Sequence, residues 1–78
     1  MKYEIQISRV HRGSPFNCSE VIPDLQSDLP IDKVIDLPEV SRAIDKTFGR
    51  YLRVFISEVF PFTGNFIEYE VTKPKAIL

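Results

Sequence analysis

The residues of this chain that could perform chemistry are few and lie apart in the sequence. Cys18 is the single cysteine and His11 the single histidine, so they form the one cysteine–histidine pair available for nucleophilic catalysis. Arg9 and Arg12 flank His11, and a positive charge beside a thiol favours its reactive thiolate form. No pattern brings Cys18 and His11 together. We therefore expect Cys18 to be a small apolar side chain in a loop and His11 a solvated residue at a strand end.

Metal and cofactor sites also lack their usual ligands and motifs. A structural zinc site needs four closely spaced ligands, usually Cys or His, and the chain has one of each. Carboxylates are plentiful between residues 15 and 46, but the glycine-containing spacing of an EF-hand is absent. So are the phosphate loop GxxxxGK(S/T), the dinucleotide motif GxGxxG and the zinc motif HExxH. We expect no catalytic residue, no metal site and no cofactor, and hence a protein that is not an enzyme.

Basic side chains beside aromatic ones suggest a nucleic-acid surface. Tyr51 and Phe55 share a predicted strand face with Arg53, and rings beside cations are how single-strand binders stack bases. Glu68 and Glu70 would share that face and repel phosphate, so a charge ladder between Arg53 and the glutamates is favoured. The net charge of −1 also excludes a strongly basic, histone-like binder. Nucleic acid is thus the less favoured partner. The candidate residues for it are Arg9, Arg12, Arg50 and Arg53.

A cluster of phenylalanines gives better support to a protein partner. Phe60, Phe62 and Phe66 surround Pro61, and Phe55 could extend their patch over a strand face. Exposed aromatic rings are typical of surfaces that a partner covers. The alternative is that these rings fold back to cap a small core. The unpaired edges of a small sheet offer a second route, to another protein or to a second copy in a homodimer. The candidate partner-binding residues are Phe55, Phe60, Phe62 and Phe66.

These candidate residues need strands to position them, and the hydropathy pattern predicts three. Residues 2–10 and 65–73 alternate between apolar and polar side chains, as half-buried strands do. Residues 50–60 alternate as well, and the segment 61–64 between the last two strands is typical of a hairpin turn.

The segment 50–60 is also compatible with a helix. Together with Phe48, its apolar residues form a helical stripe, and such a helix would run through Gly49 to Phe60 and stop at Pro61. Aromatic and β-branched residues favour a strand, and glycine inside a helix costs about 1 kcal/mol relative to alanine. We favour the strand.

One helix is predicted over residues 36–49. Asp36 suits the N-cap, Pro38 the first turn, and Gly49 the position just past the end. The apolar residues of this segment recur every three or four positions, at Leu37, Val40, Ile44 and Phe48.

Residues 11–36 show no sustained period. Pro23 and Pro30 block a long helix through this acidic stretch. We expect a long acidic surface loop with a helical turn near residues 31–35.

Assembled, residues 1–78 form a single α+β domain: a three-stranded antiparallel sheet with one helix packed on one face and a long acidic loop. The helix residues Val40, Ile44 and Phe48 would cover the inner face. That face would consist of Tyr3, Ile5, Ile7, Leu52, Val54, Ile56, Ile67, Tyr69 and Val71.

The expected function is that of a non-catalytic protein-binding module. A single cysteine excludes an internal disulfide and favours a reducing interior, so we expect a cytoplasmic protein. No signal peptide is evident, and no apolar run approaches the ~18 residues of a transmembrane helix. With 78 residues, the chain has the size of an accessory, regulatory or inhibitor protein, such as phages and mobile elements encode.

Overall fold

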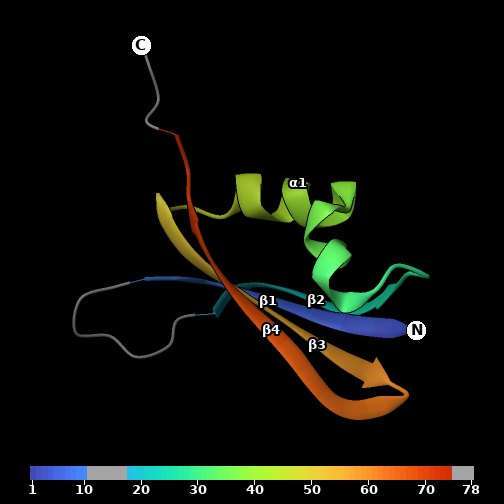
Figure 1. The fold of residues 1–78 in the computed structure, drawn as a ribbon. Helices are drawn as coiled ribbons and strands as arrows, with labels where there is room; N and C mark the ends of the chain where they lie inside the picture. The colour runs from blue at the N-terminus through green and yellow to red at the C-terminus, as the bar shows by residue number, and fades with distance from the viewer. Residues whose placement is uncertain (11–17, 75–78) are drawn as a thin grey trace.

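The computed structural model describes residues 1–10 and 18–74, which form a four-stranded antiparallel sheet with its helices on one face (Figure 1). The strands lie in the order β2-β1-β3-β4, so β1 and β3 are central. The elements are β1 (Lys2–Arg9), β2 (Cys18–Gln26), the 3-10 helix η1 (Ile31–Asp36), α1 (Pro38–Lys46), β3 (Tyr51–Phe60) and β4 (Phe62–Thr72).

The strand interpretation of residues 50–60 is confirmed. β3 pairs with β1 on one side and with β4 on the other, so the backbone groups on both of its edges have hydrogen-bonding partners. Gly49 lies just before β3 with φ of 122°, a conformation that side-chain-bearing residues rarely adopt. This glycine lies in the short connection between the helix end at Lys46 and the start of β3 at Tyr51. The hairpin is tighter than expected, because β4 already begins at Phe62.

The prediction of three strands is wrong, because residues 18–26 form a fourth strand along β1. Tyr3 lies opposite Leu25 and Ile5 opposite Ile22, with a register shift between the two pairs. The shift puts two core-facing residues of β2 three positions apart, which removes the alternation that would have revealed the strand. The expected long acidic loop is therefore largely regular structure. Its helical turn is confirmed as η1, and residues 11–17 lie outside the described residues.

The helix is shorter than the predicted 36–49. Asp36 is not its N-cap: that position belongs to Leu37, without a side-chain cap, and Pro38 opens the helix as expected. The helix ends at Lys46, after which the hydroxyl of Thr47 donates to the carbonyl of Ala43 at 2.7 Å. Phe48 was expected to cover the sheet, but it lies past the helix end and is 82% exposed.

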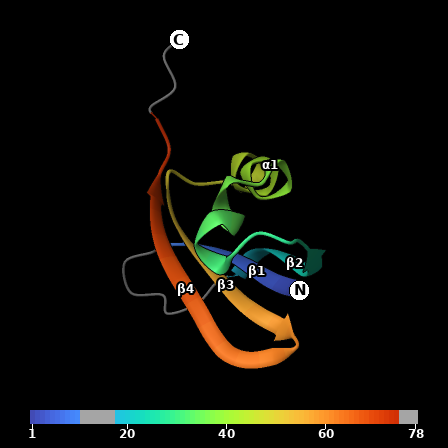
Figure 2. The ribbon, with the colours of Figure 1, turned by 45° about the vertical axis from the view of Figure 1, so that its right-hand side comes forward.

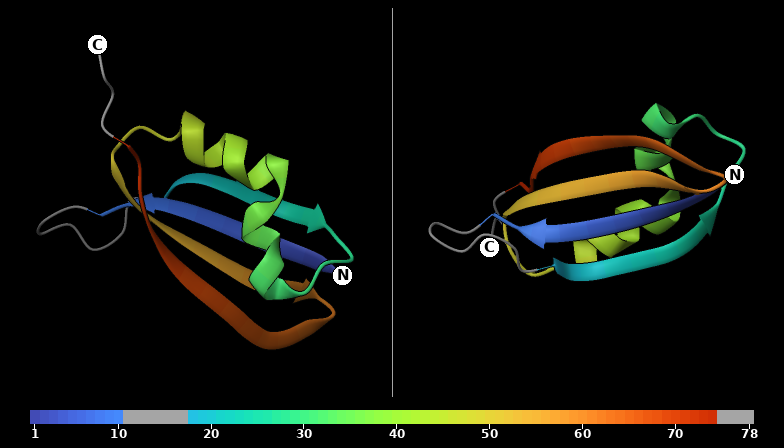
Figure 3. Two further views of the ribbon diagram at one scale, coloured as in Figure 1. Left: turned by 45° about the horizontal axis from the view of Figure 1, so that its top comes forward. Right: turned by 90° about the horizontal axis from the view of Figure 1, so that it is seen from below.

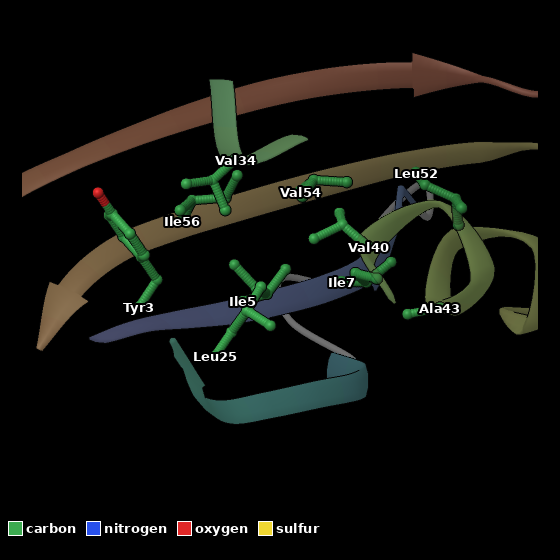
Figure 4. Close-up of a cluster of buried hydrophobic side chains, with 10 residues drawn as sticks. All are labelled: Tyr3, Ile5, Ile7, Leu25, Val34, Val40, Ala43, Leu52, Val54 and Ile56. Atoms are coloured by element: carbon green, nitrogen blue, oxygen red, sulfur yellow. The ribbon is translucent and has the colours of Figure 1, made fainter. Parts of the chain in front are cut away.

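The core lies between the sheet and the two helices (Figure 4). Val34 of η1 covers β3, and Val40 and Ala43 of α1 lie above β1 and the start of β3. Ile67, Tyr69 and Val71 are only partly buried, because β4 is an edge strand. The buried hydrophobic residues are Tyr3, Ile5, Ile7, Leu25, Val34, Val40, Ala43, Leu52, Val54 and Ile56.

The two faces of the sheet differ in what covers them. Both helices lie on the inner face, and the view from below shows β4, β3, β1 and β2 in front of them (Figure 3). The turn of the β3–β4 hairpin lies away from α1 (Figure 2). The outer face and this turn are therefore the surfaces that no other described element of the chain covers.

Candidate functional site

Two phenylalanines stand at the turn between β3 and β4. Phe60 and Phe62 lie on either side of Pro61 and are 69% and 81% exposed. The Phe60–Pro61 peptide bond is cis, and Val59 pairs with Phe62 across the turn. The ammonium group of Lys2 lies 5.9 Å from the centre of the Phe60 ring, within range of a cation–π contact. The question left open by the sequence is thereby answered: these two rings are exposed.

A second pair of rings lies on the outer face, on the two strands that the turn joins. Phe55 of β3 and Phe66 of β4 are stacked, with centroids 5.1 Å apart and ring planes at 24°. Phe66 lies opposite Ser57 in the register, so its ring reaches diagonally across the ladder to Phe55. Phe66 remains 61% exposed, whereas Phe55 is half-buried. We call Phe55, Phe60, Phe62 and Phe66 the aromatic hairpin surface.

A buried carboxylate on the inner face, that of Glu58, stabilises this hairpin through hydrogen bonds. Glu58 is only 7% exposed. Its Oε1 accepts hydrogen bonds from the hydroxyl of Thr63 and, at 3.0 Å, from Nδ2 of Asn65. The hydroxyl of Thr63 also accepts the backbone N–H of Asn65 at 3.1 Å. These bonds fix the β4 segment between Phe62 and Phe66, so the aromatic hairpin surface rests on an ordered base.

The sequence did not single out Glu58. The alternation in β3 places Glu58 on the same face as Ile56 and Val54, and that parity is the signal that could have found it. A carboxylate on a core-facing position needs hydrogen-bond donors close by. Here Thr63 and Asn65 of the turn region supply them.

Of the predicted nucleic-acid candidates, Arg53 is engaged by acidic neighbours. Its Nε lies 2.9 Å from a carboxylate oxygen of Glu68, and Nη2 lies 3.9 Å from Glu70. The Glu68 contact is close in distance but not aligned as a hydrogen bond. The charge ladder expected from the sequence is present, and it leaves Arg53 poorly placed to bind phosphate.

Arg9 and Arg50 lie at the opposite end of the sheet from the hairpin turn, each against an exposed ring. The guanidinium of Arg9 is 5.7 Å from the centre of the Phe48 ring, and that of Arg50 is 5.4 Å from Tyr51. Arg50 Nε also donates to the carbonyl of Lys73 at 3.3 Å. The fold therefore separates Arg9 and Arg50 from the aromatic hairpin surface. Arg12 lies outside the described residues.

The side chains considered for catalysis are outside what the structure describes. His11 lies outside it, and Cys18 is described only by its place at the start of β2. Among residues 1–10 and 18–74, no group of three or more His, Cys, Asp or Glu side chains could hold a metal ion. Within the same residues, neither helix has the length and apolar character to cross a bilayer.

Comparison with known proteins adds no further identification. The chain matches no family model, no curated protein and no solved structure. The class that the fold defines is a small α+β domain with one covered and one open sheet face, and the function must be argued from its surfaces.

Proposed function

We propose that this protein is a non-catalytic protein-binding module that acts through the aromatic hairpin surface, as an accessory, regulatory or inhibitor protein in the cytoplasm. One observation carries the proposal. Phe60, Phe62 and Phe66 are 61–81% exposed in a domain whose buried hydrophobic cluster closes without them. Monomeric proteins seldom expose clustered aromatic rings, whereas interfaces are enriched in them.

The arrangement of the rings supports a protein partner. Phe55 and Phe66 stack on the outer face, and Phe60 and Phe62 extend the apolar surface to the hairpin tip. The Glu58 hydrogen bonds hold the supporting backbone, so little ordering would be required on binding. A rigid aromatic anchor of this kind is what interface hot spots consist of.

The test compares Phe62→Ser and Phe66→Ser, singly and together, with a matched control. Phe48→Ser is that control, because Phe48 is equally exposed but lies elsewhere on the molecule. Each tagged protein is used for affinity capture from a lysate of its source cells, followed by quantitative mass spectrometry.

We expect the captured partner to be lost from the double variant and retained by wild type and Phe48→Ser. Light scattering reports whether that partner is a second copy. Equal capture by all three proteins contradicts the proposal. If circular dichroism shows that Phe62→Ser alone unfolds the domain, the rings belong to the core and the proposal fails as well.

A second candidate function is single-stranded nucleic-acid binding at the other end of the sheet. The observation that favours it is the pair of ring–guanidinium contacts, Arg9 with Phe48 and Arg50 with Tyr51. Rings beside cations can stack bases while the cations contact phosphate. A labelled oligonucleotide should then bind wild type with an affinity that falls steeply with salt, and bind Phe48→Ser more weakly. No binding at low salt rejects this candidate.

A further inference from the structure

The β4 strand presents one free backbone edge. β4 pairs with β3 alone among the described strands. Two backbone hydrogen bonds fix the direction of these groups: on the β1 side of β3, Val10 N–H donates to Tyr51 C=O, and on the β4 side, Lys73 N–H donates to Arg50 C=O. In antiparallel pairs the bonded residues alternate, so the odd-numbered residues of β4 face β3. The N–H and C=O groups that point to the free edge are those of Phe66, Glu68, Glu70 and Thr72.

The other edge of the sheet is not open in the same way. β2 carries Pro23, which lacks an N–H, and its pairing with β1 has two register irregularities. Prolines and bulges are devices that blunt an edge against strand addition. The regular part of β4, from Phe66 to Thr72, has neither proline nor register shift. β4 is therefore the edge at which this sheet can be extended.

The free edge of β4 is acidic on its outer face. On the outer face, Glu68 and Glu70 both lie within ion-pair distance of Arg53, and the side chain of Glu70 is 81% exposed. On the inner face, the hydroxyl of Tyr69 lies 3.4 Å from the backbone carbonyl of Asp32. Burial raises the pKa of Tyr69, and the nearby charges of Asp32 and Asp36 raise it further.

Among the described residues, few basic groups lie near this edge. Lys33 of η1 is exposed, and Lys73 is held by the backbone carbonyls of Thr47 and Asp45. Between the acidic groups, the half-buried side chains of Ile67 and Val71 leave apolar surface at the border of the core. A strand added here would need cations on its outer face and apolar side chains on its inner face.

We propose that the free edge of β4 accepts an antiparallel strand from another protein, in which basic and apolar residues alternate. The basic residues pair with Glu68 and Glu70, and the apolar ones extend the core beside Ile67 and Val71. This inference rests on the proposed function, because it gives the chemistry of the partner that binds next to Phe66. The antiparallel direction continues the pattern of every strand pair in the sheet.

A second copy of β4 does not supply this chemistry. In a symmetric antiparallel pair, residues with outward-pointing backbone groups face one another across the new ladder. Each glutamate would then lie opposite an even-numbered residue of β4, and none of these residues between Phe62 and Thr72 is a cation. Like charges directly opposite are unfavourable. The charge pattern therefore points to a different chain.

The test uses a synthetic peptide of alternating lysine and valine, about eight residues long. Calorimetry or fluorescence anisotropy measures its binding to the full-length protein. We expect saturable binding by wild type, and at least roughly tenfold weaker binding by a peptide of the same composition with its lysines and valines in separate blocks. Equal binding of the two peptides shows that charge alone is recognised and overturns the inference, as does no binding of the alternating peptide.

Backbone methylation of the peptide tests strand pairing itself. In the antiparallel arrangement, the residues opposite Glu68 and Glu70 direct their N–H groups at β4, and these are the lysines. N-methylation of the lysines should abolish binding, whereas N-methylation of the valines should leave it nearly unchanged. Binding that survives lysine methylation contradicts strand addition, and binding that is lost on valine methylation contradicts the antiparallel direction.

Variants of the protein test the same edge from the other side. The double variant Glu68→Gln/Glu70→Gln should bind the alternating peptide roughly threefold to thirtyfold more weakly, since each opposite-charge pair across a ladder contributes modestly. Glu68→Pro removes an N–H that faces the free edge and spares the ladder with β3, so it should abolish binding while the protein stays folded. The glutamine variants keep the inference testable if the proline variant does not fold, and unchanged binding by them overturns it.

Failure of this inference and failure of the proposed function are distinguishable. Phe48→Ser alters neither the β4 edge nor the aromatic hairpin surface and should bind the alternating peptide like wild type. If the peptide fails to bind wild type while Phe62→Ser and Phe66→Ser still lose the captured partner, only the strand-addition inference falls. If the peptide binds as expected but those variants keep their partner, the aromatic hairpin surface is not the interface.

Discussion

Replacing Phe62 with serine should cost little stability, although phenylalanine is among the largest apolar side chains. Full burial of such a side chain contributes about 1.5–3 kcal/mol. Phe62 is 81% exposed, so about a fifth of this contribution is realised, which is about 0.3–0.6 kcal/mol. Ile56 is fully buried on the inner face, and Ile56→Ala should cost about 2–5 kcal/mol. The two substitutions should therefore differ several-fold in effect.

The stability loss of Phe66→Ser should lie between those of Phe62→Ser and Ile56→Ala. Phe66 is 61% exposed, so its burial contributes about 0.6–1.2 kcal/mol, and its stacking on Phe55 adds about 0.5–1.5 kcal/mol. Urea unfolding followed by circular dichroism measures the three free energies of unfolding, with the denaturant slope checked for constancy. A loss of more than about 2 kcal/mol for Phe62→Ser would refute the reasoning, because it would place Phe62 in the core.

Three further predictions concern the elements that hold the hairpin and the core. Thr63→Val removes a donor from buried Glu58 and should lower the free energy of unfolding by about 1–3 kcal/mol in urea titrations; an unchanged value would show that the carboxylate does not need it. Gly49→Ala should destabilise by about 1–3 kcal/mol, because φ is 122° and the new Cβ would lie 3.1 Å from the Arg9 side chain; a thermal midpoint at or above that of wild type argues against this. Burial, and then the charge of Glu58, raises the pKa of Tyr3, so the folded state holds this proton more tightly than the unfolded state. The free energy of unfolding should thus fall as the pH rises above 10, and Tyr3→Phe should reduce this alkaline fall. At neutral pH the variant should lose about 0.5–1.5 kcal/mol, because it lacks the hydrogen bond from the Tyr3 hydroxyl to the carbonyl of Leu29. Equal alkaline slopes for wild type and Tyr3→Phe would contradict this prediction.

The sequence was sufficient for the parts of the fold in which alternation is regular. β1, β3 and the regular part of β4 keep strict period two, so their inner faces were predicted correctly. β2 was missed because its register shift breaks that period and because Pro23 is a poor strand residue at all but edge positions.

The helix shows a different limit of sequence reasoning. Asp36 is of a residue type that often caps helices. Here, however, it is the last residue of η1, and the helix begins at Pro38. Phe48 continues the apolar spacing of the helix. The backbone has turned extended at Thr47, however, so Phe48 points into solvent near Arg9.

The candidate site was predictable in its residues and not in its exposure. The cluster around Pro61 is visible in the sequence, but nothing in the pattern distinguishes rings that cap a core from rings that face solvent. That distinction depends on the fourth strand, because β2 and η1 supply Leu25 and Val34 to the core. With those residues in place, the core is filled without the hairpin phenylalanines.

The most direct measurement of the central claim is photo-crosslinking from the surface itself. A benzophenone amino acid replaces Phe62 in one protein and Phe48, the equally exposed control, in another. After irradiation in source-cell lysate, we expect position 62 to yield a discrete adduct with a protein, identified by mass spectrometry, and position 48 to yield none. Adducts at neither position, or the same adducts at both, would contradict a protein-binding role for the aromatic hairpin surface.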